Sequence, residues 1–163
     1  MKTLIVWLFL ISSTLAGEPL SIRIANEETY GYCWWACADS ILRTNGRESD
    51  LVGLAVRTGL GYGPGKGADL SSIKLLLWHT NVEHTYLTPD RCWSRKENVI
   101  ATCSPWTSQN LCHAIVVIDS RSYILNGYRY YDVVYWDPNE PEQYSVMPWY
   151  KFRAICKYGH IVK

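Results

Sequence analysis

The sequence lacks an excess of charge of either sign. Its 16 Lys and Arg residues nearly balance its 15 Asp and Glu residues, so the formal net charge is +1. Proteins that attract nucleic acid or an anionic membrane surface need a clear basic excess or a basic cluster. We therefore expect neither nucleic acid nor a charged lipid surface as a partner.

A long hydrophobic run is also missing. The longest apolar stretch, Leu4–Ile11, is far shorter than the roughly 20 residues of a membrane-spanning helix. It follows Lys2 and precedes Thr14-Leu15-Ala16, which is the pattern of a secretory signal peptide. We expect residues 1–16 to be removed and residues 17–163 to form a single domain that is secreted or periplasmic, without membrane insertion.

The chain lacks the motifs that bind nucleotides and metals. In the glycine-rich stretch 59–70, Leu60 replaces the first glycine of a phosphate loop, and Gly67 replaces its Ser or Thr. We predict a loop at the rim of a cleft there. His79 and His84 are not accompanied by a CxxC pair, so we expect no metal site and no cofactor.

Cysteines, by contrast, are present in number, and we read them in the light of the predicted export. The sequence has Cys33, Cys37, Cys92, Cys103, Cys112 and Cys156. An even number in an exported protein indicates disulfides. Cys92 with Cys103 would close a short loop and is the bridge that we favour, while Cys37, Cys112 and Cys156 compete for a second bond. A bridge between Cys33 and Cys37 would strain a helix, so Cys33 is either a free thiol or half of a longer-range bridge.

Hydrophobic periodicity predicts helices in the first half of the chain. After an extended lead-in over 19–28, one helix begins near Cys33 and ends at Asn45-Gly46. A second, capped by Ser49 or Asp50, runs through Leu51–Val56 and ends at Gly59. A third begins at Asp69 or Ser71.

Strand patterns dominate the second half. We predict strands over Val82–Leu87, from His113 through the run HAIVVID, and over Tyr144–Met147. The segment ILNGYRYYDVVYWDP reads as a hairpin that turns at Asn126-Gly127. A capping-box signature formed by Ser94 and Glu97 predicts a short helix through Val99 and Ile100. Helices followed by an antiparallel sheet indicate the α+β class.

Three residues in this arrangement suit thiol chemistry. Cys33 stands at a predicted helix start, whose partial positive charge favours a thiolate. His113 opens a buried strand, where a polar side chain is costly unless it has a partner or a role. Asp137 ends the returning strand of the hairpin, so it could meet His113 and orient the imidazole.

These motifs resemble those of compact papain-like cysteine proteases of bacteria, which include secreted effector proteases and bacteriocin leader peptidases. The resemblance rests on CWWAC, then HAIVVID, then VVYWDP, together with Pro105 ahead of the histidine strand, and it covers about Glu27 to Phe152. It implies a papain-like domain that hydrolyses peptide bonds of a peptide or protein substrate. Cys33 would be the nucleophile, His113 the base and acid, and Asp137 the orienting group.

The sequence departs from that family at two positions. Where the family has a glutamine that helps to stabilise the oxyanion, this chain has Glu27, whose carboxylate would repel the developing charge. A protonated Glu27, an amide from Asn26, or a catalytically weak protein would each account for it. The second departure is Cys112, where a glycine commonly precedes the histidine.

Two other functions remain open at the level of sequence. One is a secreted binding module with the same fold and all cysteines bridged, and the other is amide transfer as in transglutaminase-like proteins. With only residues 17–26 ahead of the catalytic region, we expect no long inhibitory propeptide. Control would then come from a proteinaceous inhibitor or from oxidation of Cys33.

Overall fold

A computed structural model gives the structure of the chain over residues 32–59, 70–93, 97–104 and 112–163. The predicted signal peptide, the lead-in, Glu27, residues 60–69 of the glycine-rich stretch, Ser94 and Pro105 lie outside these residues. Within them, no helix has both the length and the apolar character needed to cross a bilayer.

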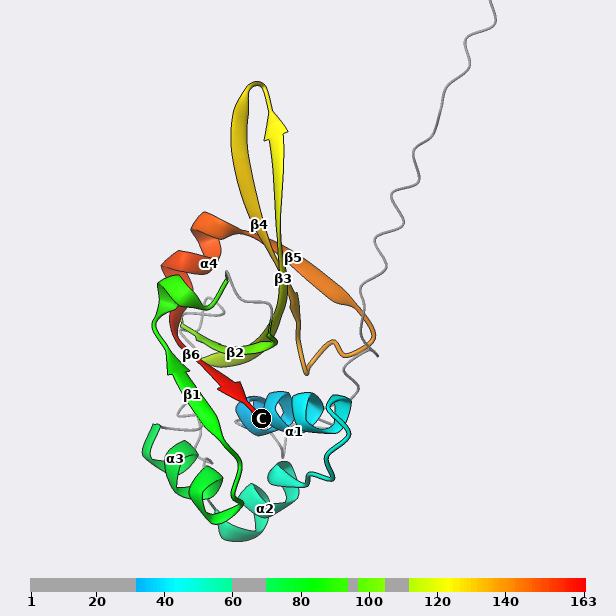
Figure 1. Cartoon of the computed structure of the whole chain (residues 1–163), viewed down its shortest axis with the longest axis vertical. Coiled ribbons are helices and arrows are strands. Elements are labelled where there is room, and N and C mark those ends of the chain that lie inside the picture. The colour runs from blue at the N-terminus through cyan, green and yellow to red at the C-terminus, as the bar shows by residue number, and fades with distance from the viewer. Residues whose placement is uncertain (1–31, 60–69, 94–96, 105–111) are drawn as a thin grey trace, which may run out of the picture.

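Helices come first and strands follow. The elements are α1 (Cys33–Thr44), α2 (Leu51–Thr58), α3 (Leu70–His79), β1 (His84–Leu87), the 3-10 helix η2 (Pro89–Arg91), β2 (Val99–Cys103), β3 (His113–Leu125), β4 (Tyr128–Trp136), β5 (Tyr144–Pro148), α4 (Trp149–Ile155) and β6 (Cys156–Val162). Figure 1 shows α1, α2 and α3 gathered at one end, with the β3–β4 hairpin projecting from the other.

The strands form one sheet in the order β1-β6-β2-β3-β4-β5, and every neighbouring pair is antiparallel. Successive residues of β3 point to opposite faces. Ala114 and Val116 join the core cluster formed with the first three helices, whereas Ile115 and Val117 join a second cluster with Phe152 of α4. The sheet is therefore covered by helices on both faces.

Helix α1 is the central element of the first core cluster. All residues from Cys33 to Leu42 are buried, so this helix is enclosed on every side over most of its length. Its buried Asp39 accepts hydrogen bonds from the backbone N–H groups of Leu51 (2.7 Å) and Val52 (2.9 Å). The carboxylate thus binds free N–H groups in the first turn of α2 and fixes the two helices together.

The predicted boundaries of the first two helices are confirmed. Gly46 follows α1 with a φ of 75°, and Gly59 ends α2 with a φ of 67°. Both values lie in the left-handed region that favours glycine. Asp50 is the residue that caps α2, since its side chain accepts from the backbone N–H of Gly53 at 3.1 Å.

One predicted element was wrong, and three were not foreseen. Residues Val99–Cys103 form strand β2 instead of the predicted short helix. This apolar, partly β-branched segment packs between β3 and β6, and pairing on both sides outweighs a local capping signal. The 3-10 helix η2, helix α4 and strand β6 were not predicted from the sequence.

The predicted hairpin is confirmed, with Asn126 (φ 51°) and Gly127 (φ 79°) at its turn. It changes character along its length. The first five residues of β3 are buried, whereas the outer half of the hairpin is exposed. The exposed large hydrophobic and aromatic side chains there are Tyr123, Ile124, Leu125, Tyr128, Tyr130 and Tyr131.

Candidate active site

Cys33 is the first residue of α1, and its side chain is buried beside the start of β3. The backbone N–H of Ala114 donates to the Cys33 Sγ at 3.3 Å. The free N–H groups at a helix N-terminus carry a partial positive charge that favours an anion nearby. The sulfur therefore lies where two sets of backbone donors favour negative charge.

The second cysteine of α1 lies one turn further along and is held differently. The Cys37 thiol donates to the carbonyl of Ala114 at 3.4 Å. Burial, together with the charges of Cys33 and Asp137, raises the pKa of Cys37 well above its usual value. Ala114 thus contacts both sulfurs through its backbone, and Cys37 remains a neutral thiol.

His113 and Asp137 meet across the hairpin, as the sequence predicts. The His113 Nε2 lies 2.8 Å from the Asp137 Oδ1, and both side chains are buried. His113 also makes a side-chain hydrogen bond with Cys33. Because Nε2 is engaged by the carboxylate, the other ring nitrogen, Nδ1, is left for the sulfur.

The environment of His113 favours its charged form. Burial alone would lower the pKa of His113, but hydrogen bonds with Asp137 and Cys33 and the charges of both raise it to about 9. The hydrogen bond with Asp137 is the largest single contribution that raises the pKa of His113. A histidine with this pKa is an imidazolium at neutral pH, placed directly beside a cysteine sulfur.

The turn after β4 holds Asp137 in place. The backbone N–H of Asn139 donates to the same Oδ1 that contacts His113, at 2.8 Å, and the N–H of Glu140 donates to the Asp137 carbonyl at 3.0 Å. An Asp that accepts from the backbone two residues ahead is a common way to open a turn. Asp137 therefore serves as a turn residue and as the partner of His113 at once.

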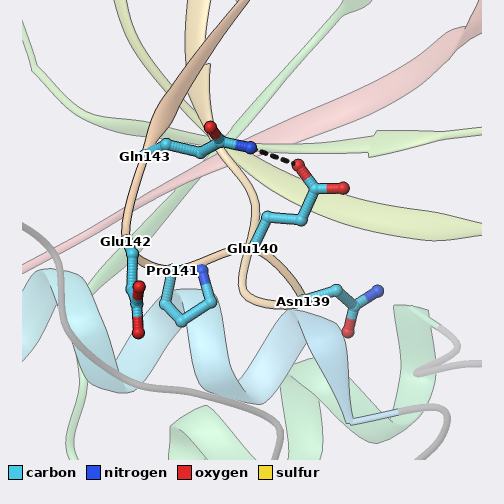
Figure 2. A pocket seen from close by; sticks show the side chains of 5 residues that line it. All are labelled: Asn139, Glu140, Pro141, Glu142 and Gln143. Atoms are coloured by element: carbon cyan, nitrogen blue, oxygen red, sulfur yellow. Dashed lines mark hydrogen bonds between the residues drawn. The ribbon is translucent and has the colours of Figure 1, made fainter.

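A pocket of about 500 Å³ lies along this same turn, and Figure 2 shows the side chains that line it. They are Asn139, Glu140, Pro141, Glu142 and Gln143. The Gln143 Nε2 donates to the Glu140 Oε2 at 2.9 Å. The pocket thus begins two residues beyond Asp137, and its lining includes two carboxylates.

All six cysteines are free thiols in the structure. The predicted Cys92–Cys103 bridge is therefore not formed, and Cys156 makes side-chain hydrogen bonds with both of these residues. Cys112, directly before His113, is the exposed member of the six. The described residues contain no cluster of three or more His, Cys, Asp or Glu side chains suited to a metal ion.

The structure brings together three of the four residues that the sequence singled out, namely Cys33, His113 and Asp137. Glu27, the fourth, lies outside the described residues. Ala114, whose backbone N–H contacts the Cys33 sulfur, was not among the predicted site residues. Backbone donors have no sequence signature, so only its position after His113 could have suggested this contact.

No family model matches the sequence, and no curated protein matches it either. Among solved structures, the fold is similar to the peptidase domain of ComA from Streptococcus, a bifunctional ABC transporter involved in a quorum-sensing pathway. The TM-score is 0.61 at 12% sequence identity, and the match covers 88% of this chain and 96% of that domain. The predicted α+β, papain-like fold is confirmed by this likeness.

Proposed function

We propose that the chain is an exported cysteine peptidase that hydrolyses peptide bonds through Cys33, His113 and Asp137. The observation that carries the proposal is the hydrogen-bonded series from the Cys33 thiol through the His113 imidazole to the Asp137 carboxylate. The likeness in fold to a peptidase domain supports the same reaction class. The substrate would be a peptide or a protein.

The geometry suggests a sequence of proton transfers. His113 holds the proton of the Cys33 thiol, and the resulting thiolate attacks the carbonyl carbon of the substrate. The imidazolium then gives this proton to the leaving amine, which departs and leaves a thioester on Cys33. His113 next takes a proton from water as that water attacks the thioester, and it returns the proton to the departing sulfur.

Asp137 contributes to this cycle without touching the substrate. Its Oδ1 accepts from Nε2, which fixes the tautomer with Nδ1 facing the sulfur and stabilises the imidazolium. The Asn139 backbone N–H holds the same oxygen in position. We infer that Asp137 is a positioning residue for His113. The turn after β4 holds Asp137 in its own place.

Stabilising the oxyanion requires donors near Cys33. The backbone N–H of Cys33 at the start of α1 is one candidate. The resemblance to papain-like proteases assigns the second donor to the position of Glu27. If Glu27 merely occupies a glutamine's place, the Glu27→Gln variant will match or exceed the parent in kcat/KM on a fluorogenic peptide library. A collapse of activity would show that the carboxylate has a separate role.

The decisive experiment compares the two cysteines of α1. Wild-type protein, Cys33→Ala and the matched control Cys37→Ala are incubated with iodoacetamide across pH, and peptide mapping locates the label. We expect iodoacetamide to label Cys33 faster than Cys37, whose thiol is kept neutral by burial. We also expect hydrolysis of the peptide library to disappear in Cys33→Ala and to persist in Cys37→Ala.

Undiminished hydrolysis in Cys33→Ala would sink the proposal. Products analysed in the presence of a primary amine separate hydrolysis from amide transfer, since transfer would attach the amine to the acyl group. Export is tested independently by N-terminal sequencing of the protein recovered outside the cytoplasm. A mature chain that begins at Gly17 supports the proposed signal peptide, and an intact Met1 contradicts it.

A further inference from the structure

Three thiols converge in the second core cluster, which also contains Phe152 of α4. Cys103 ends β2, Cys156 begins β6, and Cys92 follows the short helix η2. All three are buried among the residues of that cluster. None of them belongs to the site formed by Cys33, His113 and Asp137.

Cys103 and Cys156 lie directly opposite each other in the pairing of β2 with β6. Directly opposed residues of antiparallel strands have Cα atoms about 4.5–5.5 Å apart. A disulfide spans Cα separations of about 4.4–6.8 Å. The pairing also shifts register between Thr102 and Cys103, and such irregularities alter the local twist of a strand.

The thiol of Cys156 is the centre of the group. It makes side-chain hydrogen bonds with the thiols of both Cys103 and Cys92. The contact with Cys103 is the main cause that raises the pKa of Cys156 to about 12, so the Cys156 thiol is neutral in the folded, reduced protein. The sulfurs of Cys103 and Cys92 are thus both within reach of the Cys156 sulfur.

The place of the third thiol depends on a glycine. A Cβ atom at Gly159 of β6 would lie 2.5 Å from the Cys92 Sγ and 3.0 Å from the Val99 Cγ1. Any side chain there would displace Cys92 from the cluster. The Cys92 thiol also donates to the Thr88 carbonyl at 3.3 Å, which anchors it at the end of η2.

We propose that Cys156 is the hub of a disulfide site, which forms a Cys103–Cys156 bridge under oxidising conditions and holds Cys92 as the alternative partner. The bridge joins the C-terminal strand β6 to the central strand β2. It goes beyond the proposed peptidase function, because it uses none of the residues of the candidate active site.

The oxidation balances with a small-molecule disulfide such as oxidised glutathione. During folding, while the thiols are still exposed to solvent, the Cys156 thiolate attacks one sulfur of the oxidant, which releases one small thiol and leaves a mixed disulfide. The Cys103 thiolate then displaces the second small thiol. Two protein thiols are oxidised to one disulfide, and one small disulfide is reduced to two thiols, which carry the two protons.

This pairing answers the question raised by the even number of cysteines. One bridge between Cys103 and Cys156 leaves four thiols, so Cys33 need not take part in any disulfide. Cys37 is separated from Cys33 by one helical turn and is held on the Ala114 carbonyl. An exported cysteine peptidase would thus keep its reactive thiol and still carry a stabilising bridge.

The test is refolding of the reduced, denatured mature chain in a buffer of reduced and oxidised glutathione, which gives every thiol access to the oxidant. Free thiols are then alkylated, and non-reducing peptide mapping identifies linked peptides. We expect the Cys103 and Cys156 peptides to be linked. We expect the oxidised protein to melt roughly 5–10 °C above its reduced form.

Two variants sharpen this result. Cys103→Ala should move the bridge to Cys92–Cys156, and the matched control Cys112→Ala, which alters the exposed cysteine, should leave Cys103–Cys156 linked. Full alkylation of Cys103 and Cys156 after refolding of the wild-type chain would overturn the proposal, as would a dominant bridge that includes Cys112. Neither readout uses enzymatic activity, so failure here is distinct from failure of the proposed peptidase function.

Discussion

Two buried histidines in this chain show opposite behaviour. His113 hydrogen-bonds with Asp137 and Cys33, and its pKa is raised to about 9. His160 is fully buried, and neither of its ring nitrogens has a hydrogen-bond partner in the described part of the chain. Burial, with the charges of His84 and Lys74, lowers the pKa of His160 to about 4. Partners, more than burial, therefore decide the charge state of a buried imidazole.

Aromatic rings surround His160. Trp34, Tyr86 and Tyr158 meet its ring edge to face, with centroids 5.4, 5.5 and 5.6 Å away. Such pairs stabilise a neutral ring and offer it no carboxylate. Trp34 directly follows Cys33 in α1. Two neighbouring residues of one helix therefore contact the two histidines, because Cys33 contacts His113 and Trp34 contacts His160.

The two shifts link stability to pH with opposite signs. A histidine whose pKa is raised by folding stabilises the fold below its unfolded value of about 6.5, and His113 loses this contribution as pH rises toward about 9. His160 has a lowered pKa, so the unfolded chain binds a proton first as pH falls from about 6.5 toward about 4. The contribution of these two histidines to the free energy of unfolding should therefore be highest near pH 6.5. It should fall as pH rises toward about 9 and as pH falls toward about 4.

The largest effect is expected when the carboxylate partner of His113 is removed. Asp137→Asn should lower the pKa of His113 and reduce kcat on the peptide library by about 10³–10⁴-fold, as loss of the orienting carboxylate does in serine proteases. The measurement is a pH profile of kcat/KM. The exposed carboxylate Asp119 gives the matched control Asp119→Asn, which should match the wild type. Equal activity in both variants would refute the role of Asp137.

A second test removes the histidine that lacks a partner. His160→Phe and His160→Leu should abolish the acid penalty, which is about 3 kcal/mol for a shift from 6.5 to about 4. Urea unfolding at pH 7 and pH 4 measures it as the change in stability between the two pH values. His79→Gln, at an exposed histidine of α3, should retain the wild-type difference. If the wild type has the same free energy of unfolding at both pH values, the lowered pKa of His160 is contradicted.

The smallest expected effect comes from a neighbour of His160. His84 contributes a charge that lowers the pKa of His160, and its ring centroid lies 6.0 Å from that of His160. His84→Gln should therefore raise the pKa of His160 and reduce the acid penalty, by less than about 1 kcal/mol because His84 is exposed and its charge is screened. NMR titration of the His160 ring measures the shift, and a downward shift would contradict this account.

Much of the site, but less of the sheet, could be predicted from the sequence. Cys33 and His113 were identifiable because a helix start and a polar residue at the head of an apolar run are local patterns. The strand β2 was mistaken for a helix because its conformation depends on β3 and β6, which lie far from it in sequence. The rings around His160 come from three separate elements, so no sequence window contains them.

Thiol pairing shows the same limit. The short spacing of Cys92 and Cys103 suggested a bridge, whereas the sheet places Cys156 opposite Cys103. Spatial neighbours across a sheet are set by strand order, and strand order was not predicted. The glycine that makes room for Cys92 likewise has meaning only once β6 lies beside it.

The docking of α1 on β3 has a further consequence for how the chain becomes reactive. Ala114 and Cys33 are separated by 81 positions, so their contact requires closure of a long loop, which is slow compared with helix formation. A chain that is still unfolded would not have the histidine beside the sulfur. Reactivity of Cys33 would therefore report the docking of α1 on β3, and its appearance during refolding would time that long-range step.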